Sequence, residues 1–175
     1  FWPAFGNTRF FTLVTELLVT ILGIGMALVM AKDFHGRGLL RAAVLVPWAI
    51  PTAITAKLWA FLFSEQGIVN SIFHAHVAWQ TDPWAARFSI ILADVWKTTP
   101  FMALLILAGL QMIPKDLYEA ARMDGANAWQ RFTRITLPLA KNSIIVAVLF
   151  RMLDALSKYH LPYIMLGRPP ESPTA

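Results

Sequence analysis

Four long apolar stretches constrain this chain more than any other feature of its sequence. They cover residues 10–31, 39–63, 88–113 and 144–164. About 20 helical residues, rising about 1.5 Å each, cross the hydrocarbon core of a bilayer, which is about 30 Å thick. Each stretch therefore predicts a membrane-spanning helix, and we expect an all-α, polytopic transmembrane helical bundle forming one domain over residues 1–175. Two prolines, Pro47 and Pro51, fall inside the second stretch, so we expect a kink there.

The composition agrees with a membrane protein and argues against other classes. Hydrophobic residues make up 57% of the chain and charged residues only 14%, which is too apolar for an ordinary soluble domain. The net charge of +5 does not indicate nucleic acid, because the basic residues flank the apolar stretches. Thiolate ligands are excluded because the chain has no cysteine, and His74 and His76 stand in a loop without a further ligand. We therefore expect no metal site.

The basic residues also predict which ends of the spans face the cytoplasm. Residues 32–41 hold three Lys or Arg and residues 114–141 hold five, whereas residues 64–86 hold none. Cytoplasmic loops carry an excess of Lys and Arg. We therefore expect the first two segments on the cytoplasmic side and the third outside, with a short amphipathic helix around residues 67–76.

The polar segment between the third and fourth spans, residues 114–138, predicts two short helices joined by a glycine. Asp116 is expected to cap the first helix, with Glu119 three residues later completing a capping box. Gly125 falls where a glycine in the left-handed conformation commonly ends a helix.

The second short helix repeats this pattern. Asn127 is expected to cap it, Gln130 lies three residues later, and Pro138 is expected to end it. A compact helix–glycine–helix element between membrane spans suggests a part shaped to be held by a partner in solution.

This segment resembles the EAA loop of binding-protein-dependent ABC importer permeases. That loop reads Glu-Ala-Ala, three residues, Gly, nine residues, Ile, one residue, Leu-Pro, and every element is present here at its expected spacing. A lone Glu119 would be a surface capping residue, but seven specified residues over twenty positions rarely coincide. The resemblance marks as ATPase-coupling residues Glu119, Ala120, Ala121, Asp124, Gly125, Ala126, Ile135, Leu137 and Pro138.

The resemblance covers most of the chain and implies the core of a type I ABC importer permease of the carbohydrate branch. It implies a multi-pass protein of the bacterial inner (cytoplasmic) membrane that imports a disaccharide such as trehalose. The family core has six spans, so we expect one further span before Phe1 and one after Ala175. The family's partners are a second permease subunit in a heterodimer, two copies of a cytoplasmic ATPase and an extracytoplasmic sugar-binding protein.

The chain itself is expected to be a transport subunit and not an enzyme. It contains no Gly-x-x-x-x-Gly-Lys-Ser/Thr sequence, so it does not bind ATP by a P-loop. No Ser-His-Asp set or pair of carboxylates stands out as catalytic. The resemblance implies no cofactor in this chain, with ATP and Mg bound by the partner ATPase.

Several polar residues inside the spans are candidates for the substrate path. Asp94 and Lys97 share a helix face and can pair, as can Arg151 and Asp154. Such groups are either neutralised structural pairs or part of a sugar-facing or gating surface, because ionisable residues within a membrane face the bundle interior or a cavity. The candidates for substrate contact are Asp94, Trp96, Lys97, Thr98, Asp154, Tyr159 and His160.

The same polar residues are also compatible with a protein of another class. A proton-coupled carrier, or a membrane-embedded enzyme working without an ATPase, could use Asp94, Lys97, Asp154 and His160 as a proton relay. Dependence of transport on ATP, and co-purification of an ATPase, distinguish the importer from this alternative.

Overall fold

The computed structural model describes residues 2–74, 76–157 and 165. These residues form helices with no strand among them, which confirms the all-α prediction. The elements are α1 (Trp2–Ala31), α2 (Arg37–Ala49), α3 (Thr52–Leu62), α4 (Ile68–Phe73), α5 (Pro83–Gln111), α6 (Lys115–Met123), α7 (Ala128–Arg131), a π-helical segment (Phe132–Thr136) and α8 (Leu137–Ser157).

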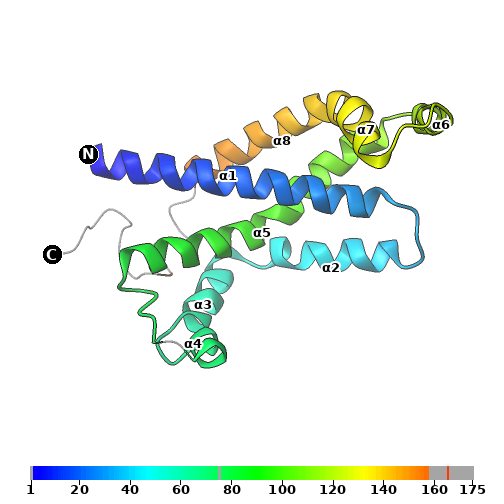
Figure 1. The fold of residues 1–175 in the computed structure, drawn as a ribbon. Helices are drawn as coiled ribbons and strands as arrows, with labels where there is room; N and C mark the ends of the chain where they lie inside the picture. The colour runs from blue at the N-terminus through cyan, green and yellow to red at the C-terminus, as the bar shows by residue number, and fades with distance from the viewer. Residues whose placement is uncertain (1, 75, 158–164, 166–175) are drawn as a thin grey trace.

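The long helix α5 forms the centre of the bundle (Figure 1). It packs against α1, α2, α3 and α8, and its buried side chains join those of α1 and α8 in one hydrophobic core. Glycine allows close approach in this core, since a Cβ on Gly23 of α1 would lie 2.7 Å from Met102 Cγ of α5. Small residues of this kind let membrane helices pack closely.

The second span is broken rather than gently kinked. α2 and α3 meet at an angle of 88°. The break lies at Ile50, which is extended (φ −70°, ψ 132°) directly before Pro51, while Pro47 stays inside α2. A residue before proline disfavours the helical conformation. Within the part of the chain that the structure describes, three helices are long and apolar enough to cross a membrane, and the bent pair makes a fourth crossing if it counts as one span.

The other spans begin earlier than their apolar stretches suggested. α5 starts at Pro83 instead of residue 88 because Asp82 Oδ1 accepts hydrogen bonds from the backbone N–H groups of Trp84 (3.0 Å) and Ala85 (2.7 Å). The helix that holds the fourth span begins at Ala128, not at residue 144. The far end of the predicted fourth span, residues 158–164, lies outside the described residues.

The two basic segments lie at the same end of the bundle. Lys115 Nζ at the start of α6 is 3.3 Å from Asp33 Oδ2 in the loop between α1 and α2. Figure 1 shows α6 and this loop at one end, and α3 and α4 toward the other. The structure thus agrees with the prediction that the basic segments share one side and the loop at residues 64–86 lies on the opposite side.

Candidate functional site

The first helix of the predicted coupling loop, α6, is not capped as the sequence suggested. Its N-cap is Pro114, with no side-chain capping bond, and Asp116 lies inside the first turn. The capping-box prediction for Asp116 and Glu119 is wrong, because the helix is capped at the extended Pro114 (ψ 134°), two residues earlier than predicted. The negative charge of Asp116, in the first turn, still stabilises the N-terminal end of α6 by interacting with the helix dipole.

The end of α6 follows the prediction for Gly125. This glycine has φ +79°. The N–H of Ala126 donates to the carbonyl of Ala121 (2.9 Å) and that of Gly125 to Arg122 (3.0 Å), which is the Schellman arrangement. The chain therefore turns sharply at Gly125 by a conformation that glycine adopts at little cost.

The capping box of the second short helix is also confirmed. Asn127 Oδ1 accepts from the N–H of Gln130, and Gln130 Oε1 accepts from the N–H of Asn127, both at 2.8 Å. The helix does not end at Pro138, however. It continues through the π-helical segment into α8, so residues 128–157 form one helical rod.

The π-helical segment has a physical cause in Pro138. Proline donates no N–H, and its ring clashes with the carbonyl four residues earlier, here that of Arg134. The wider turn lies directly before this position, and the N–H of Leu137 donates to Phe132, five residues back. Such π segments often occur at functional sites. Pro138 is thus accommodated inside a helix that joins the loop directly to the fourth span.

A hydrogen bond holds the loop against the end of the bundle. The hydroxyls of Tyr118 in α6 and Thr136 in the π-helical segment are 2.9 Å apart. Tyr118 and Ile135 also pack against the hydrophobic core. Sequence reasoning missed the contact, because two single hydroxyls 18 residues apart form no pattern that marks them as partners.

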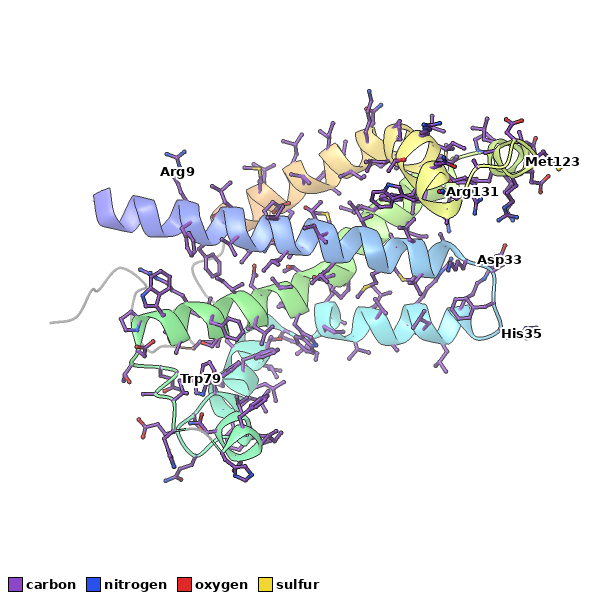
Figure 2. All side chains as sticks on the ribbon, in the orientation of Figure 1. Arg9, Asp33, His35, Trp79, Met123 and Arg131 are labelled. Carbon is purple, nitrogen blue, oxygen red and sulfur yellow. The ribbon has the colours of Figure 1, made fainter. Side chains whose placement is uncertain are left out.

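The candidate coupling residues divide into an exposed set and a set turned toward the protein. Exposed are Glu119, Ala120, Asp124, Gly125, Leu137 and Pro138; half-buried are Ala121, Ala126 and Ile135. Two large apolar side chains that the sequence analysis did not select are among the most exposed, Met123 (88%) and Trp129 (70%). Figure 2 shows Met123 at the end of the molecule.

The candidate substrate-path residues lie mainly along the buried face of α5. Asp94, Lys97 and Thr98 are each at most 5% exposed. Asp94 forms an ion pair with Arg151 of α8, whose side chain is 2% exposed. The pairing predicted from spacing did not include this partner, because the two residues are 57 positions apart.

The remaining polar candidates are placed differently. Lys97 Nζ donates to the carbonyl of Ile50, where α2 ends, and so helps to hold the break in the second span. Thr98 Oγ1 donates to the carbonyl of Asp94 (2.7 Å). Trp96 is half-buried and lies edge-on to Trp59 of α3 (centroids 5.7 Å apart).

Toward the C-terminal end of α8, Oδ2 of Asp154 lies 3.8 Å from Nη1 of Arg151, which agrees with the pairing predicted for these two residues. The side chain of Asp154 is 46% exposed. Tyr159 and His160 lie outside the described residues. Among the residues that the structure describes, no group of three or more His, Cys, Asp or Glu could hold a metal ion.

These features define a class: a polytopic helical membrane protein in which one span continues into an exposed, glycine-hinged loop. The chain belongs to the family of binding-protein-dependent transport system inner membrane components, whose sequence model matches residues 20–173. Membership confirms the resemblance drawn from the loop.

Two relatives and one solved structure show how close the similarity is. The chain is 47% identical to the trehalose/maltose transport system permease protein of Thermococcus litoralis, over 99% of this chain and 61% of the relative. It is 41% identical to the sulfoquinovosyl glycerol transport system permease protein of Agrobacterium fabrum, over 99% of this chain and 58% of the relative. The chain thus spans about three-fifths of the length of these relatives.

The fold matches that of a solved transporter. A chain of a bacterial ABC transporter involved in the import of the acidic polysaccharide alginate aligns with a TM-score of 0.80 and 28% identity, over 93% of this chain and 62% of that chain. The permease fold predicted from the apolar stretches and the loop is therefore confirmed.

Proposed function

We propose that this chain is the membrane-spanning permease subunit of an ATP-driven sugar importer in the bacterial cytoplasmic membrane. The observation that carries the proposal is the loop at residues 114–138, which keeps the family spacing and joins the fourth span through one continuous helix. It would work with a second permease subunit, two ATPases that bind ATP and Mg, and an extracytoplasmic binding protein. The trehalose/maltose relative supports a sugar cargo.

The mechanism we propose is alternating access driven through the loop. The ATPase holds α6 by its exposed face, including Glu119 and Met123, and moves it during the ATP cycle. Because residues 128–157 form one helical rod, this movement reaches Arg151 in the bundle. Coupling requires that the ATPase favour one position of the loop over another, since a partner can shift only an equilibrium between states that it binds differently.

The charges in the bundle favour a neutral sugar over an anionic one. Arg151 is paired with Asp94 and lies near Asp154, so its charge is already compensated. The oxygens of Glu16 are also buried close to this pair. An anionic cargo would find the positive charge of Arg151 already compensated, whereas a neutral disaccharide meets groups that hydrogen-bond to hydroxyls.

Uptake by the reconstituted complex tests the proposal. The permease, its partner permease, the ATPase and the binding protein are placed in liposomes and given labelled trehalose, maltose and sulfoquinovosyl glycerol. We expect ATP-dependent uptake of a neutral disaccharide and little uptake of the sulfonated glycoside. Uptake that proceeds without ATP or an ATPase would instead favour the proton-coupled carrier. Uptake of the sulfonate alone would contradict the assignment of a neutral cargo.

A further inference from the structure

The bundle interior holds a carboxylate whose role nothing described so far explains, Glu16 of α1. Both of its oxygens are buried, and neither accepts a hydrogen bond from a residue of another helix among those that the structure describes. Its surroundings include the charges of Arg151 and Asp94 and the hydroxyl of Thr20, one turn further along the same helix. A buried carboxylate without a cationic hydrogen-bond partner is costly, so an arrangement that supplied such a partner would stabilise Glu16.

The packing of α1 on α5 places Glu16 beside the ion pair. Gly23 of α1 lies against Met102 of α5, and the two helices run in the same direction (Figure 1). Glu16 comes seven residues before Gly23, and Asp94 eight residues before Met102. At about 1.5 Å per residue these steps are nearly equal, and a seven-residue step returns to the same face of a helix. Glu16 and Asp94 therefore occupy the same level, with Glu16 turned toward α5.

Arg151 has unused donors that complement the unused acceptors of Glu16. Its Nη2 binds Asp94. Its buried Nε and Nη1 make no hydrogen bond to any described residue, although Nη1 also lies 3.8 Å from Oδ2 of the half-exposed Asp154. One guanidinium thus lies between two carboxylates on different helices and hydrogen-bonds to only one of them. Arg151, which lies between Asp94 and Glu16, belongs to α8. This helix continues into the coupling loop.

We propose that Arg151 exchanges its carboxylate partner between Asp94 on α5 and Glu16 on α1 as the transporter changes conformation. This inference rests on the proposed function, because movement of the coupling loop supplies the displacement of α8. In the described state Asp94 holds the guanidinium and Glu16 makes no hydrogen bond to it. In the other state Glu16 holds it. Such an exchange provides two discrete arrangements in a packed bundle, as a switching element requires.

The exchange is tested by measuring how often the transporter occupies each of its two conformations. The chain has no cysteine, so Leu39→Cys on α2 (78% exposed) and Leu139→Cys on α8 (52% exposed) carry spin labels at defined places. Distances between the labels are measured by electron paramagnetic resonance in the assembled transporter, with and without a non-hydrolysable ATP analogue. The wild-type subunit is expected to show two distance populations whose ratio depends on the nucleotide.

The two carboxylates should bias this ratio in opposite directions. Glu16→Gln leaves Asp94 as the only buried carboxylate beside Arg151, and we expect at least a tenfold shift toward the population that matches the described structure. Asp94→Asn should shift the ratio the other way. Thr20→Val, which alters a neighbour of Glu16 without changing charge, should shift it less than twofold.

A third variant separates exchange from a general disturbance of packing. In an Arg151→Gln background, Glu16→Gln and Asp94→Asn should no longer displace the populations in opposite directions, because the shared partner is gone. If Asp94→Asn fails to assemble, Glu16→Gln alone must still enrich the described state. Shifts in the same direction, no shift in Glu16→Gln, or opposite shifts that persist without Arg151 would overturn the exchange. A wild-type complex that transports no sugar would count against the proposed function instead.

Discussion

Gly109 lies where α5 passes against α8, whereas Gly125 lies at the exposed end of α6. A Cβ on Gly109 would come within 2.2 Å of Ser143 Oγ. A Cβ on Gly125 would meet no atom within 4 Å, but the backbone there has φ +79°. The first glycine serves close packing between distant segments, and the second serves a local turn.

This difference extends to the regions around the two glycines. In the bundle, residues far apart in sequence decide the structure, as the Asp94–Arg151 pair shows. In the loop, residues within a few positions decide it, as the Asn127–Gln130 capping box shows. Substitutions in the bundle should therefore act on folding, and substitutions in the loop on coupling. The following variants test that division.

The largest effect is expected from breaking the buried ion pair. Asp94→Leu leaves the guanidinium of Arg151 buried without this carboxylate, and loss of one partner of a buried pair costs about 3–5 kcal/mol. We expect a strong loss of folded protein in the membrane, measured by yield and by unfolding in mild detergent. Asp154→Ala removes an exposed partner of the same arginine and should cost less than about 1 kcal/mol.

A double variant tests whether the unpaired guanidinium causes the loss of folded protein in Asp94→Leu. Asp94→Leu with Arg151→Met replaces both charges by apolar groups, which is often neutral in buried pairs. We expect the yield of folded protein to recover, while sugar uptake stays low if these residues face the cargo. A double variant that folds no better than Asp94→Leu would show that the instability does not come from the unpaired guanidinium.

The packing glycine should give the next largest effect. Gly109→Ala forces α5 and α8 apart or displaces Ser143, and overpacking of this kind costs about 1–3 kcal/mol. Adding Ser143→Gly should restore stability, because it removes the side chain that the new methyl meets. Gly25→Ala is the matched control, since a Cβ at Gly25 meets no atom within 4 Å. Equal losses in Gly109→Ala and Gly25→Ala would mean that close packing at Gly109 is not the cause.

The turn glycine should affect coupling more than folding. Gly125→Asp places a side chain at positive φ, which costs about 1–2 kcal/mol, and adds a charge on the exposed end of α6. We expect the subunit to insert normally while sugar uptake is lost, measured together with ATPase pull-down and sugar-stimulated ATP hydrolysis. Gln130→Ala should have a milder effect. Normal uptake and stimulation in Gly125→Asp would show that this part of the chain is only a surface loop.

Tyr118→Phe should have a smaller effect at the boundary of the two regions. It removes one hydroxyl that bonds to Thr136 and leaves the ring in the core, so the expected loss is about 0.5–1.5 kcal/mol. If this bond transmits movement from α6 to the rod, sugar-stimulated hydrolysis should fall more than the melting temperature suggests. Thr136→Val should reproduce the result, and no additional loss is expected when the two changes are combined.

The same division explains what the sequence alone could predict. Stretches of about 20 apolar residues leave few alternatives to membrane helices, and the Gly125 turn and Asn127 cap follow from local rules. The Asp116 cap and the end at Pro138 were wrong, because Pro114 starts α6 earlier and a π-helical turn accommodates Pro138. Asp94 bonds to Arg151, 57 residues away, and Lys97 to the carbonyl of Ile50, 47 residues away, so spacing along one helix could not reveal these two contacts.

The smallest effect is expected at the exposed ion pair beside the loop. The hydrogen bond from Lys115 lowers the pKa of Asp33 from its ordinary value, and the positive charges of Lys115 and Arg37 act in the same direction. A lowered pKa in the folded state means that the contact stabilises the protein above the ordinary value of about 3.9 and loses this effect as pH falls through the lowered pKa. Solvent screens the pair, so the contribution is small.

Asp33→Asn tests this contact against the buried pair. At pH 7 we expect a lower melting temperature than wild type, by less than for any variant above, and no difference once the pH has fallen below the lowered pKa of Asp33, where the aspartate is protonated. Salt should reduce the difference at pH 7, because charges exposed to solvent are screened. A loss in Asp33→Asn as large as that in Asp94→Leu would erase the distinction between bundle and loop, because an exposed contact would then hold the fold as strongly as a buried one.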